Sequence, residues 1–292
     1  MLRLLTAELF KLNKNKTFKV LCIVSIFLGI FTLIMSSSVM EKILESSVQG
    51  MSQEETAQVM EQLSSGSEGQ IITAGSMGVQ IAAKDPFNPT TMEVFHSSFG
   101  VGLIEVLLGI FIAGFLAKEY SSKTIKNALS YGKKRYEFYI SKFLVMIIGI
   151  AGILFALTVI PTIGHAITNE WGETFKIGHI LDILRTYGAT LITSASIASI
   201  MMIIAILIRS NGGTIGATIG IFTLFPMLIS FLYGKNDIFD TIYELTPFYT
   251  KRVSTSIYAT GGDIGKAVII ALITIIVFLC IGIQIFKKQD IN

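Results

Sequence analysis

Charged residues are scarce in this sequence. They make up 15% of the chain, whereas hydrophobic residues make up 52%, and the mean hydropathy is +0.68. An ordinary soluble domain has about 25% charged residues, so this composition argues against a soluble globular protein. The sequence therefore predicts an integral membrane protein. We expect the lipid bilayer to be one of its partners and no nucleic acid to be bound.

Cysteine and histidine are also scarce. Cys22 and Cys280 both lie inside apolar runs, which argues against a disulfide framework or a cysteine metal site. The three histidines, His96, His165 and His179, have no close carboxylate or thiol companions along the sequence. We therefore expect no metal site.

Motifs for catalysis and nucleotide binding are missing. The sequence contains no HExxH pattern and no paired intramembrane aspartates. The segment TGGDIGKA, residues 260–267, has Thr in place of the first Gly of a phosphate-binding loop and Ala in place of the magnesium-binding Ser or Thr. We expect no catalytic residue, no cofactor-binding residue and no enzymatic activity in this chain.

What is present is a series of apolar runs, each close to the roughly 20 residues that an α-helix needs to cross a bilayer. The fold class predicted is all-α, a polytopic membrane protein with six transmembrane helices in a single domain, residues 1–292. The predicted spans are about 18–36, 99–117, 142–164, 186–208, 214–233 and 266–286. The longest outer loop is 37–98, where Ser52 and Glu55 have the spacing of a capping box.

The basic residues give the orientation. Of the 23 Lys and Arg, 15 fall on the face that holds both chain ends and the loop 118–141. By the positive-inside rule, the N- and C-termini and this loop are cytoplasmic. We expect a multi-pass protein of a bacterial plasma membrane.

The first residues predict an amphipathic helix. In the segment 2–16, Leu2, Leu5, Leu9 and Leu12 form one stripe, and Glu8 lies on the other side with Arg3 and Lys11. Such a helix lies in the membrane interface. A signal peptide is the alternative, but the apolar run after this segment is longer than the usual 7 to 15 residues.

Glu105 is the one acid well inside a predicted span, where a charge costs about 2.5 to 3.5 kcal/mol. Either it contacts a cationic substrate or takes part in gating, or it is hydrogen-bonded between helices. The sequence offers no intramembrane base to form a proton relay with it. In the fifth span, Gly212, Gly216 and Gly220 recur every four residues and predict close helix packing.

The loop between the second and third spans is the most distinctive stretch. Residues 117–142, AKEYSSKTIKNALSYGKKRYEFYISK, hold seven Lys and Arg but only two acids. Ser121 to Tyr131 predict a short helix that ends at Gly132. Joined to two spans, this helix can transmit a push from a soluble partner.

This loop resembles the signature of permease subunits of type-2 ABC exporters, especially their bacitracin-resistance and lantibiotic-immunity branch. Those permeases have an acid at the end of the second span, then Gly-Thr-Leu/Ile-Lys, a Leu-Ser pair, and Arg before a Lys that opens the third span. Here Lys123 stands where Gly is usual, and Gly132 where many relatives have Pro. The matching residues are Glu119, Thr124, Ile125, Lys126, Leu129, Ser130, Arg135 and Lys142.

The resemblance implies a mechanism and partners. A separate ABC ATPase subunit, in two copies, would bind ATP and Mg and dock on the loop 118–141. A second permease copy or a homologous permease would complete the transporter. The cargo implied is an antimicrobial peptide or lipid-like antibiotic, exported or removed from the membrane, which would give immunity or resistance.

Two alternatives belong to other classes. One is a non-transporting membrane sensor whose outer loop detects a cationic peptide and signals inward. The other is an ion-coupled secondary carrier, against which the sequence shows no evident inverted repeats and no paired intramembrane charges. A neighbouring gene for an ATPase would favour the transporter, and one for a kinase would favour the sensor.

Overall fold

The computed structural model describes residues 1–36, 46, 83, 88–100, 102–122, 124–125, 134–169, 171–172, 174–230 and 232–289. Within these residues every regular element is a helix, which confirms the all-α class. The predicted capping box at Ser52 and Glu55 lies outside the described residues, as does most of the helix predicted from Ser121 to Tyr131.

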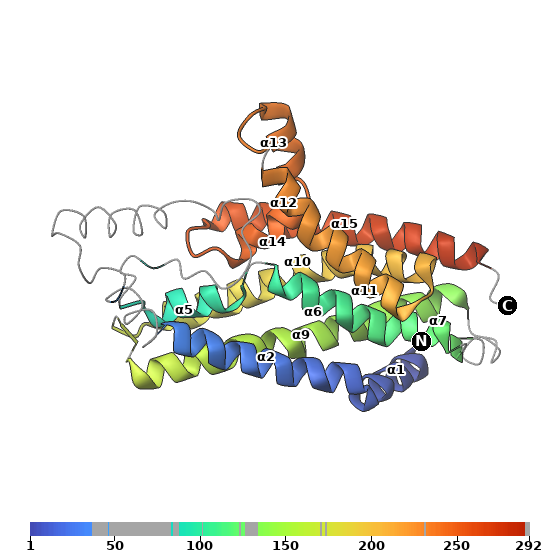
Figure 1. Ribbon diagram of the computed structural model, residues 1–292, viewed down its shortest axis with the longest axis horizontal. Helices are drawn as coiled ribbons and strands as arrows, with labels where there is room; N and C mark the ends of the chain where they lie inside the picture. Colours follow the sequence, from blue (N-terminus) through green and yellow to red (C-terminus); the bar gives the residue numbers. More distant parts are fainter. Residues whose placement is uncertain are drawn as a thin grey trace.

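Four long helices run along the long axis of the molecule (Figure 1). Each is long and apolar enough to cross a membrane, so the described residues of this helical protein include four candidate membrane-spanning helices. α2 packs along α9, and α10 packs along α15. The four helices are α2 (Lys16–Ile34), α9 (Arg135–Thr168), α10 (Ile177–Ile208) and α15 (Gly261–Lys288).

The second and fifth apolar runs are built differently. Each is a short α-helix, a π-helical turn and another short α-helix in succession, and none of the pieces reaches the length of a span by itself. The second run comprises α6 (Leu103–Ile112), η2 (Ala113–Ala117) and α7 (Lys118–Ser121). The fifth comprises α11 (Asn211–Ile219), η3 (Gly220–Leu224) and α12 (Phe225–Ser230).

Four shorter helices complete the described fold. α13 extends away from the bundle, whereas α14 packs on α10 and α15 (Figure 1). The segment TGGDIGKA starts α15 through a capping box between Thr260 and Asp263, so its glycines serve a helix start. The shorter helices are α1 (Leu2–Lys14), α5 (Thr91–Ser98), α13 (Asp237–Glu244) and α14 (Pro247–Thr255).

The structure corrects the predicted stripe of α1. Leu2 is 82% exposed and Leu9 is 37% exposed, whereas Leu4, Glu8 and Leu12 are buried. Residues four apart lie above one another on a helix, so the inner face runs through positions 4, 8 and 12. Glu8, predicted on the polar side, is therefore in the middle of the buried face.

The glycines of the fifth run do not pack against any of the residues that the structure describes. A Cβ atom built on Gly212, Gly216 or Gly220 would meet nothing within 4 Å. Close packing occurs instead where α2 meets α9. There a Cβ on Gly29 would lie 3.0 Å from the Leu157 carbonyl oxygen and 3.1 Å from Cδ of Pro161. Because proline has no N–H, the Leu157 carbonyl lacks its usual helical donor, and Gly29 lets the two helices close over that site.

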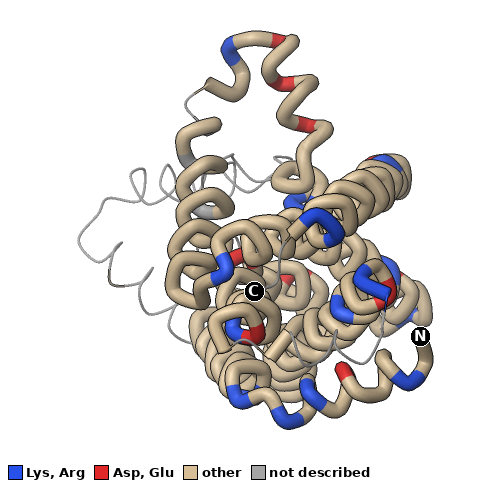
Figure 2. Tube along the Cα trace, turned by 90° about the vertical axis from the view of Figure 1, so that its right-hand side faces the viewer, with Lys and Arg blue, Asp and Glu red and all other residues tan. Residues whose placement is uncertain are grey.

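Both ends of the described chain lie at the same end of the bundle (Figure 1). Figure 2 looks onto this end and shows Lys and Arg distributed around it, with fewer Asp and Glu. The opposite end holds α5 and the connection between α9 and α10. Two of the candidate sites lie at these two ends of the bundle. A third is a buried ion pair between the ends.

Candidate functional site

The ammonium group of Lys142 is the centre of a buried charge network at the end that holds the termini. Its Nζ lies 2.6 Å from Glu8 Oε2 and 2.7 Å from Glu119 Oε1. Its side chain is fully buried, and Nζ also lies 4.1 Å from the centroid of the Phe115 ring, a cation–π contact. Lys142 therefore joins three segments, α1, α7 and α9.

Lys11 closes the network from the surface. Its Nζ lies 2.7 Å from Glu8 Oε1 and 3.1 Å from Glu119 Oε1. Burial lowers the pKa of Lys11, but the charges and hydrogen bonds of Glu119 and Glu8 outweigh burial and raise the pKa above its ordinary value. Two lysines and two glutamates thus share four contacts.

Sequence reasoning had singled out Glu119 and Lys142, and the structure brings these two together. It missed Glu8 and Lys11 as their partners. The signal was present in the spacing of Leu4, Glu8 and Leu12, because an acid between two buried leucines at intervals of four must face inward. A buried acid then requires a cation, since an isolated buried charge is too costly.

The other residues of the loop have different roles. Arg135 begins α9, and its Nη1 donates to the carbonyl oxygens of Phe286, Lys287 and Gln289 at 3.3, 2.9 and 2.6 Å. It therefore ties the end of α15 to the start of α9 and satisfies carbonyls that a helix end leaves open. Ile125 is buried and Thr124 is exposed. Lys126 and Leu129 lie outside the described residues.

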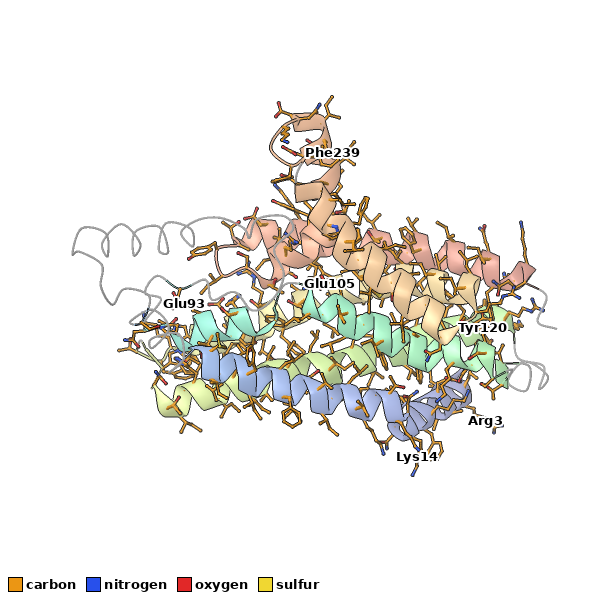
Figure 3. All side chains as sticks on the ribbon, viewed as in Figure 1. Arg3, Lys14, Glu93, Glu105, Tyr120 and Phe239 are labelled. Carbon is orange, nitrogen blue, oxygen red and sulfur yellow. The ribbon has the colours of Figure 1, made fainter. Side chains whose placement is uncertain are left out.

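The second candidate is an ion pair near the middle of the long axis, where Figure 3 places Glu105. Nζ of Lys251 lies 3.2 Å from Glu105 Oε1 and 3.3 Å from Oε2, and it also donates to the Gly100 carbonyl at 3.4 Å. Both side chains are buried. The expectation of no base beside Glu105 was therefore wrong, because Lys251 lies against it.

The reason for this error is the course of the chain before α15. Lys251 was assigned to an outer loop, but that loop contains α14, which folds back onto α10 and α15. There Ser254 Oγ lies 3.0 Å from Thr193 Oγ1 of α10, which gives one of the buried hydroxyls of the fourth run a partner. A single sequence does not show that such a segment returns to the core.

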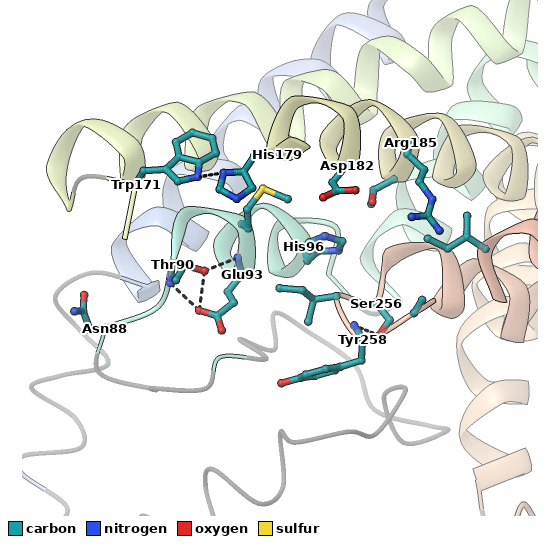
Figure 4. Close-up of a pocket in the computed structure, with 15 residues that line it drawn as sticks. Asn88, Thr90, Glu93, His96, Trp171, His179, Asp182, Arg185, Ser256 and Tyr258 are labelled. Carbon is teal, nitrogen blue, oxygen red and sulfur yellow. Dashed lines mark hydrogen bonds between the residues drawn. The ribbon is translucent and has the colours of Figure 1, made fainter. Parts of the chain in front are cut away.

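The third candidate is a cavity of about 550 Å³ at the opposite end of the bundle (Figure 4). It lies between α5, the start of α10 and the segment that leads into α15. Glu93, whose Oε2 accepts from Thr90 in the capping box of α5, lines it together with Asp182 and Arg185. The remaining polar side chains include His96 and His179. His96 and His179 therefore do have carboxylates near them. Glu93 and Asp182 lie three residues from His96 and His179 in the sequence, and the fold also brings Asp182 of α10 close to His96 of α5.

The Nε2 atoms of the two imidazoles in this cavity differ in their hydrogen-bonding role, one being a donor and the other an acceptor. Trp171 Nε1 donates to His179 Nδ1 at 2.8 Å, so the neutral His179 ring carries its proton on Nε2. His96 Nδ1 lies 3.0 Å from the Thr255 carbonyl oxygen, which only accepts, so Nδ1 carries the proton there. Nε2 of His179 is therefore a donor and Nε2 of His96 an acceptor.

Burial lowers the pKa of His96 below its ordinary value of 6.5, although the Thr255 carbonyl and the charge of Asp182 act to raise it. His96 is therefore neutral at pH 7. Among the described residues, no group of three or more His, Cys, Asp or Glu is placed to hold a metal ion. The cavity offers hydrogen bonds and a mixed charge to a polar ligand.

Comparison with known proteins gives a relative and a family. The relative is the "Uncharacterized protein YhcI" of Bacillus subtilis (strain 168), 22% identical over 204 residues that cover 64% of this chain. The chain spans 65% of the length of that relative. The family described as "Protein of unknown function (DUF2705)" matches residues 79–292. This range contains Glu105, Glu119, Lys142 and Lys251, and it covers well over half of the sequence, so the chain belongs to the DUF2705 family.

Proposed function

We propose that this chain is the membrane-spanning permease subunit of an ATP-binding cassette transporter. A separate ATPase subunit docks on the loop 118–141, and its hydrolysis of ATP drives export or membrane removal of a substrate. The substrate class is an antimicrobial peptide or a lipid-like antibiotic. Two ATPase subunits and a second permease, identical or homologous, complete the transporter.

The observation that carries this proposal is the contact between Glu119 and Lys142. These residues stand at the two ends of the loop whose motif resembles the exporter permeases, and they meet at 2.7 Å. Glu8 at 2.6 Å adds α1 to the same point. A displacement of this loop by a docked ATPase would therefore move α1, the second apolar run and α9 together. Coupling to an ATPase requires such a linked movement.

The proposal includes six spans with both termini in the cytoplasm. Once the π turns are counted, residues 103–121 form a continuous helical run of 19 residues, and residues 211–230 form one of 20 residues. At 1.5 Å per residue such a run covers about 30 Å, the thickness of the hydrocarbon core. π turns inside helices are frequent at functional sites, which suits spans that move.

A second copy of the permease has an available surface. Gly212, Gly216 and Gly220 form an open face on α11 and the start of η3. Small residues at this spacing let the backbones of two membrane helices approach closely. We propose that this face meets the second permease.

The test begins by asking whether a gene adjacent to this one encodes an ATPase. If it does, the two chains are co-expressed, purified by affinity and assayed for ATPase activity in lipid. Thr124→Arg is the informative variant because Thr124 is exposed and makes only local contacts with Ser122 and Glu119. We expect at least a tenfold loss of ATPase association. Thr241→Arg is the matched control, since Thr241 is exposed on α13, away from the loop.

Arg135 is unsuitable for this test because its loss releases the end of α15 as well. Unchanged association of the Thr124→Arg variant would contradict docking on this loop. Transport by the purified chain in the absence of any ATPase would contradict the proposal as a whole.

One observation favours a second candidate function, an ion-coupled carrier. The Glu105–Lys251 pair is the kind of buried intramembrane charge pair that such carriers use. A carrier would move substrate in response to a proton or sodium gradient without ATP, and Glu105→Gln would abolish that response. A permease would need ATP whether or not a gradient is present.

A further inference from the structure

A second cavity, of about 420 Å³, lies at the bend between α1 and α2, at the end of the bundle that holds the termini. Four lysines line it, Lys11, Lys14, Lys16 and Lys118. Figure 3 shows Lys14 at this bend. The one acid in the lining is Glu119, so the cavity is strongly basic.

Three of the four lysines have no counter-ion among the described residues. Lys11 is neutralised by Glu8 and Glu119. Lys14, Lys16 and Lys118 are exposed, and none of them forms an ion pair with a described residue. Lys14 contacts only a ring here, with Nζ 5.8 Å from the centroid of Phe10. The cavity therefore carries an excess of about three positive charges.

The start of α2 increases this preference for anions. The Asn15 side chain caps the helix by accepting from Phe18 N, and its amide donates to the Gly114 carbonyl at 3.2 Å, which fixes the helix start in the cavity wall. The first turn of α2 has no acid and carries Lys16. A helix N-terminus is itself positive and binds anions, so a lysine there is unfavourable until an anion arrives.

The flank of the cavity is apolar. Phe10 is 64% exposed, and along α2 the side chains of Val20, Ile23 and Phe27 are 55%, 53% and 67% exposed. α2 is long and apolar enough to cross a membrane, so this exposed apolar surface suits contact with acyl chains. A ligand that fits both the basic cavity and the apolar surface beside it has a negatively charged headgroup and long apolar chains.

We propose that this cavity binds the phosphate headgroup of an anionic phospholipid, whose acyl chains lie along the exposed face of α2. Basic pockets at the ends of membrane helices suit such headgroups, because each lysine near the surface contributes to the attraction. The site goes beyond the proposed function and does not depend on it, because it needs neither an ATPase nor a cargo. Its contact with Lys11 places the lipid beside the network around Lys142.

The test uses the full chain, purified in a neutral detergent, and measures binding by native mass spectrometry and by the shift of the thermal midpoint. The probes are phosphatidylglycerol, phosphatidylcholine of the same chain length, and inorganic phosphate. The variant is Lys14→Gln/Lys16→Gln/Lys118→Gln. The matched control is Lys134→Gln/Lys287→Gln/Lys288→Gln, which removes the same charge at the same end of the bundle but outside the cavity.

We expect phosphatidylglycerol to bind and stabilise the wild type and the control, and phosphatidylcholine to do neither. Removing each lysine should weaken binding about fivefold, so the cavity variant should lose on the order of 100-fold in affinity. Its thermal midpoint without lipid should match that of the wild type, because the three lysines are exposed and form no ion pair within the described part of the chain.

Three outcomes would overturn the proposal. Equal affinity of the cavity variant and the control would place the lipid elsewhere. Equal binding of phosphatidylcholine would show that charge is not what is recognised. A stabilisation by inorganic phosphate as large as that by phosphatidylglycerol would assign the cavity to a soluble anion and not to a lipid.

Discussion

Lys142 of α9 contacts residues of two other helices, Glu8 of α1 and Glu119 of α7. Its side chain is fully buried, and its ammonium group lies against Glu8, Glu119 and the face of the Phe115 ring. Breaking a buried ion pair by removing one partner costs more than removing both, because the remaining charge stays buried. This asymmetry makes the network testable residue by residue.

We expect Lys142→Met to lower the free energy of unfolding by about 3 kcal/mol, because Glu8 and Glu119 then share only the half-exposed Lys11. The double variant Lys142→Met/Glu8→Gln should recover most of this loss. Thermal unfolding in detergent measures both. Lys134→Met is the control, and a double variant no more stable than Lys142→Met would show that the buried charge was not the cause.

His96 predicts a dependence on pH. Burial lowers its pKa below 6.5, and Glu93, Asp182 and Arg185 line the same cavity. As the pH falls below 6.5, the unfolded chain takes up a proton on His96 before the folded chain does, so stability falls. The thermal midpoint should drop less between pH 7 and pH 5 in His96→Gln than in the wild type. Parallel curves for the two proteins would contradict a lowered pKa of the partly buried His96.

At the scale of elements, two glycines have opposite surroundings: Gly29 lies at a tight helix contact, and Gly216 lies on an open surface. Gly29→Ala should destabilise the fold by about 1 to 3 kcal/mol, because the added methyl meets the Leu157 carbonyl, which belongs to the backbone and cannot rotate away. Gly216→Ala meets nothing within 4 Å and should stabilise α11 by up to about 1 kcal/mol in a monomer.

Thermal unfolding combined with the measured oligomeric state decides between the possible results for the glycines. Destabilisation by Gly216→Ala, together with loss of a dimer, would assign that face to a second copy of the chain. An unchanged midpoint for Gly29→Ala would show that α2 and α9 are not in close contact at Pro161.

The long helices were predictable because each is a long, uninterrupted apolar run, and length is a strong signal. The predicted spans 18–36, 142–164, 186–208 and 266–286 all fall on long helices. The division of the second and fifth runs by π turns was not predictable, because one extra residue in a helical turn leaves no mark on hydropathy. α14 was missed for another reason, since only tertiary contact shows that it returns to the core.

At the scale of the whole molecule, the topology can be tested directly. α9 has 34 residues and covers about 51 Å, enough to cross a bilayer, with Lys134 at one end and Phe175 beyond the other. We expect Phe175→Cys to react with an impermeant maleimide in intact cells, and Lys134→Cys to react only after permeabilisation. The background is Cys22→Ser/Cys280→Ser, which should stay unlabelled. The reverse labelling would place the loop 118–141 outside the cell and contradict the proposed function.

The candidate site was half predictable. Glu119, Lys142 and Glu105 stood out because charge next to or inside an apolar run is costly and needs a reason. Their partners Glu8 and Lys251 did not, since each lies more than 100 residues away in sequence from the residue it accompanies. The spacing of Leu4, Glu8 and Leu12 indicates that Glu8 faces inward, but neither composition nor periodicity identifies the residue with which it pairs.

The network around Lys142 contains two formally positive and two formally negative side chains. A membrane potential does work only on net charge, at about 2.3 kcal/mol per elementary charge for each 100 mV crossed. When the four side chains move as one body, the electrical work therefore cancels. A displacement of this junction as one body would therefore cost the same in an energised and in a depolarised cell.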